Sequence, residues 1–317
     1  MSVVTTPVWF ESSRPMSLGL MLPIGEGSHF GETPRFTDLI EMAQAAREAG
    51  FEAIWLADHF LFENPEDGSV RGIWEAFTMM AAIAAAVPDV QIGSLVACTG
   101  FRNPALIAKT TETIDEISGG RFILGLGAGW HKPEYDAFGY PFDHRVSRFE
   151  EAMQIIQPML REGTATVEGE YFQARKAVNR PRGPRETGAP ILVGSSGDRM
   201  LGIIAKYADA WNTVWHADTS RIPDLLAKVD AACEAAGRDP KTLIRTAGGN
   251  ISMGESFGIR PNAFQGSAGE KAQHLHAFRE FGFAHFVCGL DACTPATITA
   301  FGEVIEQFDA LATEREG

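Results

Sequence analysis

Short apolar segments that alternate with segments of helical spacing are the feature that most constrains the fold of this chain. Met16–Leu22 is an apolar run, and Asp38–Gly50 then carries apolar residues at helical intervals before a closing glycine. The same order recurs until eight units of strand and helix are complete. A strand followed by a helix rather than by a hairpin predicts a parallel sheet, because parallel strands need a crossover connection.

The eight units give the predicted element list. After the first unit, the predicted strands are Phe51–Ala57, Val90–Ala97, Arg121–Gly127, Pro190–Ser196, Asp209–Trp215, Thr242–Met253 and Phe283–Gly289. The predicted helices are Trp74–Val87, Pro104–Ile117, Val146–Arg161, Arg199–Tyr207, Ile222–Ala236, Gly269–Phe281 and Thr294–Leu311. Eight units over 317 residues favour a closed (β/α)8 TIM barrel of the α/β class. An open doubly wound sheet is disfavoured because no GxGxxG motif opens the first predicted helix.

Two segments interrupt this alternation. Residues 164–190 alternate briefly around Gly169, as in a small hairpin, and then become rich in proline and arginine. Residues 254–268 are irregular. No linker rich in serine or proline divides the chain, so we expect a single domain over residues 1–317 with insertions at about 164–190 and 254–268.

The charge balance narrows the choice of partners. The chain has 27 lysines and arginines against 41 aspartates and glutamates, a net charge of −14. Such a surface repels nucleic acid and anionic lipid, so we expect neither as a partner. The N-terminal segment lacks a basic stretch followed by an apolar run, and no segment reaches the roughly 18 apolar residues of a membrane span. We therefore expect a cytoplasmic protein without a signal peptide.

Cysteine and histidine spacing gives no sign of a metal site. The four cysteines form no CxxC pair and lie at no zinc-ligand spacing to a histidine. His274 and His276 fall on one predicted helix, where their side chains point about 200° apart and cannot share an ion. We expect reduced, mostly buried thiols and no bound metal.

Polar residues just past the predicted strands are the candidates for function, because active sites of TIM barrels lie in the loops after the strands. His59 follows the second strand, where it could exchange a proton with a ligand or brace the loop. Gly127 and Gly129, on either side of Ala128, would let the backbone approach a flat ligand, or simply serve a turn. Both interpretations stay open on position alone.

A tight glycine and serine turn follows the fifth predicted strand. Gly194, Ser195, Ser196 and Gly197 lead directly into a predicted helix. Free backbone N–H groups at a helix start, with two hydroxyls beside them, suit an anion such as phosphate. Ordinary helix capping by Ser196 or Asp198 explains the same residues.

Three segments together resemble the bacterial luciferase-like superfamily of flavin- and deazaflavin-dependent oxidoreductases. They are AREAGFEAIWLADHF, the stretch from IGSLVACTGF through GGRFILGLGAGWHKPEYDAFG, and PILVGSSGDRMLGIIAKYADAWN. The resemblance implies a TIM barrel with an insertion and a reduced flavin or deazaflavin F420 at the carboxyl ends of the strands. It also implies, in many cases, a homodimer.

The resemblance assigns roles to individual positions. The cofactor phosphate is expected on Gly194–Gly197, with His59 facing the ring system. A bulge in the third strand, often with a cis peptide that does not precede proline, supports the ring from behind; by alignment it falls at Ser94–Leu95.

The sequence also departs from the superfamily's pattern. In the deazaflavin-dependent sugar-phosphate dehydrogenases a glutamate donates a proton where this chain has Trp130, and Glu63 replaces a tryptophan after the DHF motif. Sugar-phosphate oxidation by that mechanism is therefore not expected. We interpret Trp130 as a wall against the ring or an apolar substrate, with Glu134 or His131 as candidates for acid–base chemistry. Arg145 and Arg148 are expected to pair with Glu150, Glu151 or a neighbouring loop.

The leading hypothesis is an oxidoreductase that uses reduced F420 for hydride transfer to or from a small organic substrate. The alternative is an FMN-dependent monooxygenase of the same superfamily, which a separate flavin reductase would supply with reduced FMN. The ADAWN stretch and the GAGWHKPEYDAFG loop resemble the deazaflavin branch more, whereas GSS is shared with sulfonate-type monooxygenases. A flavin-binding protein without turnover and a barrel hydrolase or lyase also stay open. Residues 62–71 and 254–266 are the expected lids, and the substrate cannot be read from the sequence.

Overall fold

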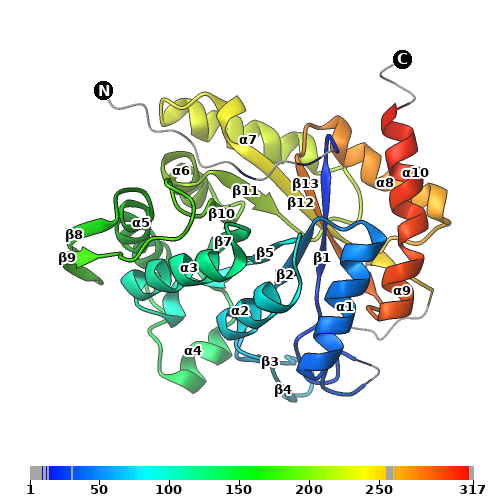
Figure 1. Ribbon diagram of the computed structural model, residues 1–317. Helices are drawn as coiled ribbons and strands as arrows, with labels where there is room; N and C mark the ends of the chain where they lie inside the picture. The colour runs from blue at the N-terminus through cyan, green and yellow to red at the C-terminus, as the bar shows by residue number, and fades with distance from the viewer. Residues whose placement is uncertain are drawn as a thin grey trace.

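Eight parallel strands form a closed barrel in the computed structural model, which describes residues 9, 12, 14–29, 31–254, 260 and 262–313. The strands are β1 (Ser17–Met21), β2 (Ala53–Leu56), β5 (Gln91–Ser94), β7 (Phe122–Gly127), β10 (Ile191–Gly194), β11 (Ala210–Thr213), β12 (Ile244–Ser252) and β13 (His285–Asp291). Their order around the barrel is β10, β11, β12, β13, β1, β2, β5 and β7, and a pairing of β10 with β7 closes it. The predicted TIM barrel is confirmed (Figure 1).

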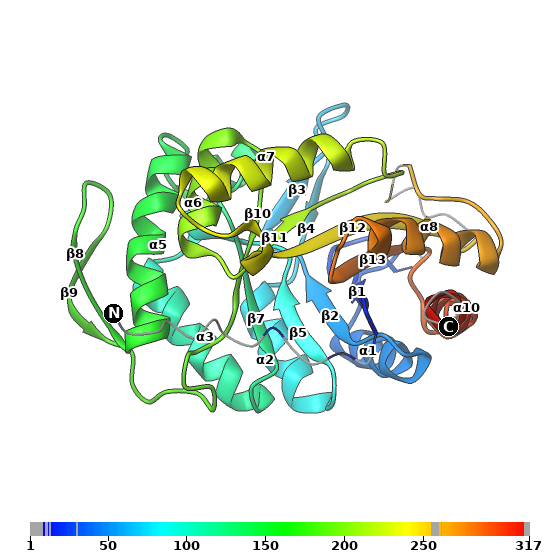
Figure 2. The ribbon, with the colours of Figure 1, turned by 90° about the horizontal axis from the view of Figure 1, so that it is seen from above.

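Helices surround the strands, as Figure 2 shows from above. They are α1 (Phe36–Ala49), α2 (Ala76–Ala86), α3 (Pro104–Ser118), α4 (Lys132–Phe138), α5 (Arg145–Glu162), α6 (Asp198–Tyr207), α7 (Ile222–Ala235), α8 (Ala268–Glu280), α9 (Pro295–Ala300) and α10 (Gly302–Thr313), with short 3₁₀ turns at Thr99–Phe101 and Pro240–Thr242. Sequence signals explain the ends of α3: Asn103 caps its first turn, Pro104 begins it, and Gly119 ends it at a φ of 67°. No helix among the described residues is long and apolar enough to cross a membrane.

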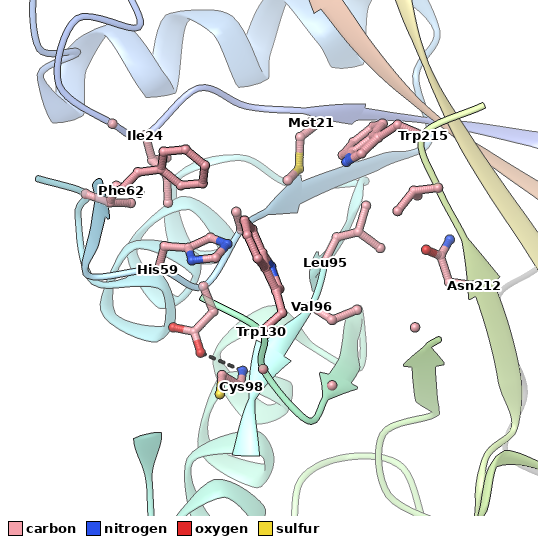
Figure 3. Close-up of a pocket in the computed structure, with 18 of the residues that line it drawn as sticks. Met21, Ile24, His59, Phe62, Leu95, Val96, Cys98, Trp130, Asn212 and Trp215 are labelled. Carbon is pink, nitrogen blue, oxygen red and sulfur yellow. Dashed lines mark hydrogen bonds between the residues drawn. The ribbon is translucent and has the colours of Figure 1, made fainter. Parts of the chain in front are cut away.

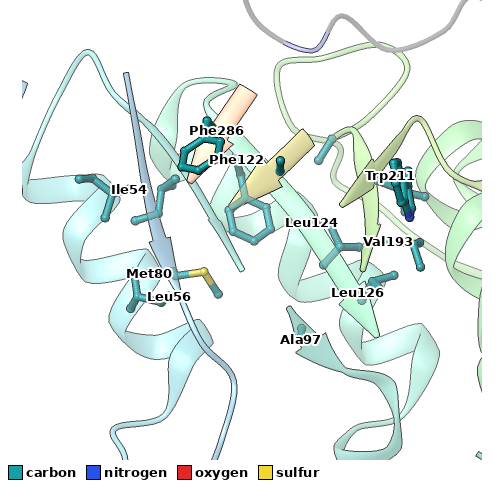
Figure 4. Packing of buried hydrophobic residues seen from close by; sticks show 14 of the residues in the cluster. Ile54, Leu56, Met80, Ala97, Phe122, Leu124, Leu126, Val193, Trp211 and Phe286 are labelled. Carbon is teal, nitrogen blue, oxygen red and sulfur yellow. The ribbon is translucent and has the colours of Figure 1, made fainter. Parts of the chain in front are cut away.

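The strands are buried on both faces, because helices cover the outside of the barrel and side chains fill the inside. Along β7, Phe122, Leu124 and Leu126 belong to the cluster that packs against the helices, part of which Figure 4 shows. Ile123, between them, belongs to a separate cluster with Trp55 and Val287. This alternation follows from the two-residue period of a strand and separates outer core from barrel interior.

Trp55 fills much of the barrel interior, and two glycines make room for it. A Cβ on Gly19 would lie 2.5 Å from Trp55 Nε1, and a Cβ on Gly93 would lie 2.6 Å from its ring. Real side chains do not approach so closely, so both positions need glycine while Trp55 keeps this orientation.

The expected irregularity in the third strand is present, but its position and the segment after β7 differ from the prediction. The third predicted strand breaks after β5 at Leu95 and Val96 and resumes as β6 (Ala97–Cys98), which pairs with β7. The cis peptide joins Leu95 and Val96, one residue later than the alignment placed it. The segment after β7 forms helix α4 rather than a loop, because Pro133 suits a first helical turn and Gly139 ends the helix at a φ of 75°.

The first predicted insertion and the first predicted lid contain hairpins. Strands β8 (Thr164–Glu168) and β9 (Gln173–Val178) pair antiparallel, as expected around Gly169. Strands β3 (Leu61–Glu63) and β4 (Val70–Gly72) form a second hairpin within the first predicted lid. The second predicted lid includes residues 255–259 and 261, which lie outside the described residues, and the single-domain organisation stays a prediction.

Candidate functional site

A cavity of about 880 Å³ opens at the carboxyl ends of the barrel strands. Figure 3 shows residues that line it from several strand ends, among them Met21 at the end of β1, His59 after β2 and Asn212 in β11. The sequence-predicted residues that line it are His59, Leu95, Gly127, Ala128, Gly129, Trp130, Glu134, Gly194, Ser195, Ser196 and Gly197. The fold therefore brings all of the predicted positions except Ser94 and His131 to a single cavity.

Ser94 does not line the cavity. Its hydroxyl donates to the carbonyl of Gly125 at 2.7 Å and accepts from the N–H of Gly125 at 3.0 Å. Its side chain is fully buried between β5 and β7. The break in the strand begins one residue later than expected and presents Leu95 and Val96 to the cavity in place of Ser94.

His59 and Glu134 form a hydrogen-bonded pair at one side of the cavity. Nδ1 of His59 lies 2.7 Å from Oε2 of Glu134, and the side chain of Glu134 is 1% exposed. The other carboxylate oxygen accepts from the backbone N–H groups of Phe60 at 2.5 Å and Leu61 at 3.3 Å. Because a carboxylate accepts, Nδ1 carries the proton, and Nε2 of His59 is left without a hydrogen-bond partner among the described residues.

The sequence offered both His59 and Glu134 for proton transfer, and the structure gives the two residues different roles. One carboxylate oxygen of Glu134 binds His59 and the other accepts from the loop backbone, so Glu134, although it lines the cavity, orients the imidazole. His59 lines the cavity and is 22% exposed, with its ring beside that of Trp130 at a centroid distance of 5.9 Å (Figure 3). Its free Nε2 can accept a proton in the neutral form and donate one in the charged form.

His131 braces the hairpin that forms one wall. Its Nε2 accepts from the N–H of Glu63 at 3.1 Å, and its ring stacks on Phe62 at 4.7 Å with an interplanar angle of 1°. Burial lowers the pKa of His131. A neutral ring that holds a backbone N–H does not serve as the acid–base group, so the alternative to Glu134 is disfavoured.

An ion-pair network fixes the backbone beneath His59. Arg102 donates to both oxygens of Asp58, at 2.6 and 2.8 Å, and to Glu75 at 2.6 Å. Asp58 also accepts from the N–H of Cys98 at 2.9 Å. Burial alone would lower the pKa of Arg102, but the two carboxylates outweigh it and the pKa is raised. The sequence placed Asp58 and Arg102 after neighbouring strands but gave no sign that they pair.

The turn after β10 provides backbone donors at another side of the cavity. Gly197 precedes α6, and no side chain caps this helix start. Nε1 of Trp211 donates to the carbonyl of Ser195 at 2.7 Å and fixes the turn. Arg145, which also lines the cavity, donates to the carbonyl of Gly129 at 2.6 Å and lies over Phe142 at 4.0 Å. Uncapped N–H groups, hydroxyls and a guanidinium together suit an anion.

Of the expected partners of Arg145 and Arg148, Glu150 and Glu151 bind other groups. Arg148 pairs with Asp143, in the loop before α5. Glu150 pairs with Arg199, and Glu151 accepts from backbone N–H groups of residues 170–172. Both arginines contact neighbouring loops, the second of the expected alternatives.

Cys98 lines the cavity but does not have the environment of a nucleophile. Its Sγ lies 2.9 Å from the hydroxyl of Tyr135, and burial raises the pKa of the thiol to about 11. The thiol therefore stays neutral near pH 7. All four cysteines are free and buried, as predicted. In the part of the chain that the structure describes, no three His, Cys, Asp or Glu side chains gather as metal ligands.

A family model described as luciferase-like monooxygenase matches residues 16–257. The chain belongs to this family. It is 34% identical over 197 residues to the F420-dependent glucose-6-phosphate dehydrogenase of Amycolatopsis mediterranei, across 59% of this chain and 55% of that protein. It is 32% identical over 214 residues to the pyrimidine monooxygenase RutA of Enterobacter cloacae, across 61% of this chain and 56% of that protein. The matches thus span little more than half the length of these relatives.

A solved structure of similar fold is that of an F420-dependent secondary alcohol dehydrogenase in complex with an F420–acetone adduct. It superposes with a TM-score of 0.74 at 22% identity, over 92% of this chain and 99% of that one. At this identity the likeness concerns the fold alone. The family contains both F420-dependent dehydrogenases and monooxygenases, so membership by itself leaves the cofactor open.

The cavity suits a planar cofactor with an anionic tail. A Cβ on Gly127 would lie 2.8 Å from Val96, and one on Gly129 would collide with Tyr135 and Cys98. Both positions therefore need glycine, and the cavity is lined there by backbone next to Val96 and Cys98. A cavity of about 880 Å³ lies within the range of about 300–1,000 Å³ that ligand sites occupy. The residues present fit such a group.

Proposed function

We propose that this protein is an oxidoreductase that uses F420 to transfer a hydride to or from a small organic substrate. The observation that carries the proposal is the free Nε2 of His59, which lines the cavity while Glu134 holds the other ring nitrogen. Interconversion of an alcohol and a carbonyl moves one hydride at carbon and one proton at oxygen. When bound, F420 supplies or accepts the hydride, so the protein must handle the proton.

His59 is the group proposed to handle that proton. In substrate oxidation Nε2 accepts the hydroxyl proton, and in carbonyl reduction the charged ring returns it. Glu134 stabilises the charged ring and keeps Nε2 directed to the cavity. The network of Asp58 and Arg102 holds the backbone from which His59 projects.

The binding roles follow from the geometry of the cavity. Leu95 and Val96 would support the ring from behind, with Gly127 and Gly129 close to its plane. The turn at residues 194–197, with Arg145, would bind the phosphate. Trp130 would shield the ring edge next to His59.

Several apolar side chains line the cavity at strand ends other than that of β10, which carries the proposed phosphate turn. Met21, Ile24, Phe62 and Trp215 are among them (Figure 3). Trp130 takes the place of the glutamate expected in sugar-phosphate dehydrogenases, and its side chain is 60% exposed at the cavity. We therefore propose a substrate with an apolar body rather than a sugar phosphate.

An FMN-dependent monooxygenase is the second candidate. The observation that favours it is the sequence match with a pyrimidine monooxygenase, at nearly the same identity as the match with the dehydrogenase. The proposed phosphate turn would serve FMN equally well, and a separate reductase would then have to supply reduced FMN.

Titration of the purified protein with F420 and with FMN tests the choice of cofactor. We expect F420 to bind with a Kd below roughly 100 μM and more tightly than FMN, measured by the change in absorbance of each compound. Preferential binding of FMN would favour the monooxygenase. Tight F420 binding without reduction of any acceptor would favour a binding protein without turnover. If neither compound binds, the proposal is wrong.

A further inference from the structure

Arg260 is a guanidinium that lines the cavity without a carboxylate partner. None of the ion pairs among the described residues involves Arg260, and its described hydrogen bond is from Nη2 to the carbonyl of Met21 at 3.3 Å. The guanidinium lies 5.9 Å from the ring centre of Trp215. Since arginine carries five N–H donors, most of them remain available to a ligand.

Other buried arginines of the described chain are satisfied by the protein. Arg102, Arg161 and Arg185 pair with Asp58, Asp209 and Asp115. Arg121 has no carboxylate but donates to four backbone carbonyls, those of Ser118, Val87, Val90 and Ala84. An unpaired guanidinium in a cavity is costly, so its presence in a chain of net charge −14 indicates a counter-charge brought by a ligand.

The end of the barrel leaves space for the side chain of Arg260. A Cβ on Gly289 of β13 would collide with Nη1 of Arg260. Gly289 therefore leaves the space that the guanidinium fills, next to the end of β1 at Met21. Burial lowers the pKa of Arg260, and the nearby Cys293 and Asp291 partly offset this effect.

The position around the barrel separates Arg260 from the proposed phosphate turn. The turn at residues 194–197 follows β10, whereas Arg260 contacts β13 and the end of β1. In the order β10, β11, β12, β13, β1, β2, these contacts lie three and four strands away from the turn. His59 follows β2, next to β1, so Arg260 lies on the side of the proton-handling group and not of the phosphate.

We propose that Arg260 binds the carboxylate of the substrate, and that the protein acts on small organic acids with an apolar body. The proposal rests on the proposed function, because it assigns to substrate the part of the cavity that the cofactor does not need. A guanidinium binds a carboxylate through two parallel N–H donors, and Met21, Trp215 and Leu290 provide apolar surface beside it.

Binding of trans-cinnamate and of its neutral amide, cinnamamide, tests the proposal without turnover. Calorimetric titrations use the protein loaded with oxidised F420 and, in parallel, the protein without cofactor. We expect cinnamate to bind at least about tenfold more tightly than cinnamamide. Arg260→Gln should abolish this preference, with the Kd for cinnamamide changed less than about threefold. Arg260→Lys should restore part of it, because it returns the charge without the planar fork.

Two further variants keep the test independent of folding. Gly289→Ala retains Arg260 but displaces its guanidinium, and should weaken cinnamate binding selectively. Arg175→Gln makes the same charge change on the exposed face of the β8–β9 hairpin and should leave the preference unchanged. Three outcomes would overturn the proposal: the wild-type protein binds both compounds equally, cinnamate does not bind below about 1 mM, or the preference for cinnamate survives Arg260→Gln. A loss of F420 affinity in Arg260→Gln would place the residue on the cofactor, which also overturns it, whereas failure of F420 to bind the wild-type protein concerns only the proposed function.

Discussion

His285 and His59 contrast the two ends of the barrel. His285 begins β13, where Nε2 accepts from Trp55 Nε1 at 2.9 Å and Nδ1 lies 2.7 Å from the hydroxyl of Ser17. His59 follows β2 at the other end, where Glu134 holds Nδ1 and Nε2 has no described partner. Tryptophan can only donate, so both histidines carry the proton on Nδ1. They differ in what faces Nε2: an indole in one case and the cavity in the other.

The difference shows how one residue type serves stability at one end and chemistry at the other. Both nitrogens of His285 are satisfied and burial lowers its pKa to about 3, so the ring stays neutral and structural. His59 has the same orientation fixed by a charged partner and keeps one nitrogen available. The completeness of the hydrogen bonding, rather than burial alone, distinguishes the two roles.

The largest effect is expected from His59→Gln. Loss of the proton-handling imidazole should lower kcat about 10²–10⁴-fold, while the Kd for F420 changes only a few-fold. Steady-state kinetics with a responsive alcohol or carbonyl substrate, together with an absorbance titration, measures both. A variant with unchanged kcat would remove His59 from the chemistry and leave both histidines structural.

His285→Phe should have the opposite effect, with lower stability and nearly unchanged turnover. The substitution leaves the Trp55 N–H and the Ser17 hydroxyl without their ring partner and should lower the free energy of unfolding by about 3 kcal/mol. Urea unfolding measures this change. Turnover per folded molecule should stay within about threefold of wild type; a large loss would mean that the two ends of the barrel are not separate in function.

Lowering the pH should reduce the stability that the buried, neutral His285 provides. Because the pKa of His285 is lowered to about 3, the imidazole takes up a proton near pH 6.5 in the unfolded chain but not in the folded chain. The stability from this histidine is therefore complete above about pH 6.5 and falls as pH decreases towards 3. Between pH 6.5 and 5 the loss should be about 2 kcal/mol more in the wild type than in His285→Phe, measured by urea unfolding at each pH. If the free energy of unfolding depended on pH in the same way in both proteins, the lowered pKa of His285 would be contradicted.

Glu134→Gln should give the smallest effect. The amide can still accept from the Phe60 N–H, but its NH₂ donates to His59 and forces the proton onto Nε2. Substrate oxidation should then lose about tenfold in kcat with KM unchanged, because Nε2 can no longer accept a proton. Glu134→Asp, which keeps the charge, is the matched control and should recover part of kcat. A change confined to KM would indicate that Glu134 contacts substrate instead.

The sequence by itself determined the barrel and the face that carries the site. Strand and helix periodicity are local properties, set by burial of every second residue or of one helical stripe. They located His59, Gly127–Gly129 and the turn at residues 194–197 at strand ends, and the resemblance named the family that the comparison then found.

Only the tertiary structure decided which side chains act together. Ser94 is hydrogen-bonded to Gly125 inside the sheet and does not line the cavity, because a strand presents alternate residues to opposite faces and the break falls one residue later than expected. The pairing of His59 with Glu134 joins positions 75 residues apart, and Arg260 reaches strands β13 and β1 from a segment that follows β12. Such contacts arise when the barrel closes and brings distant strand ends to one rim, and no local pattern in the sequence encodes them.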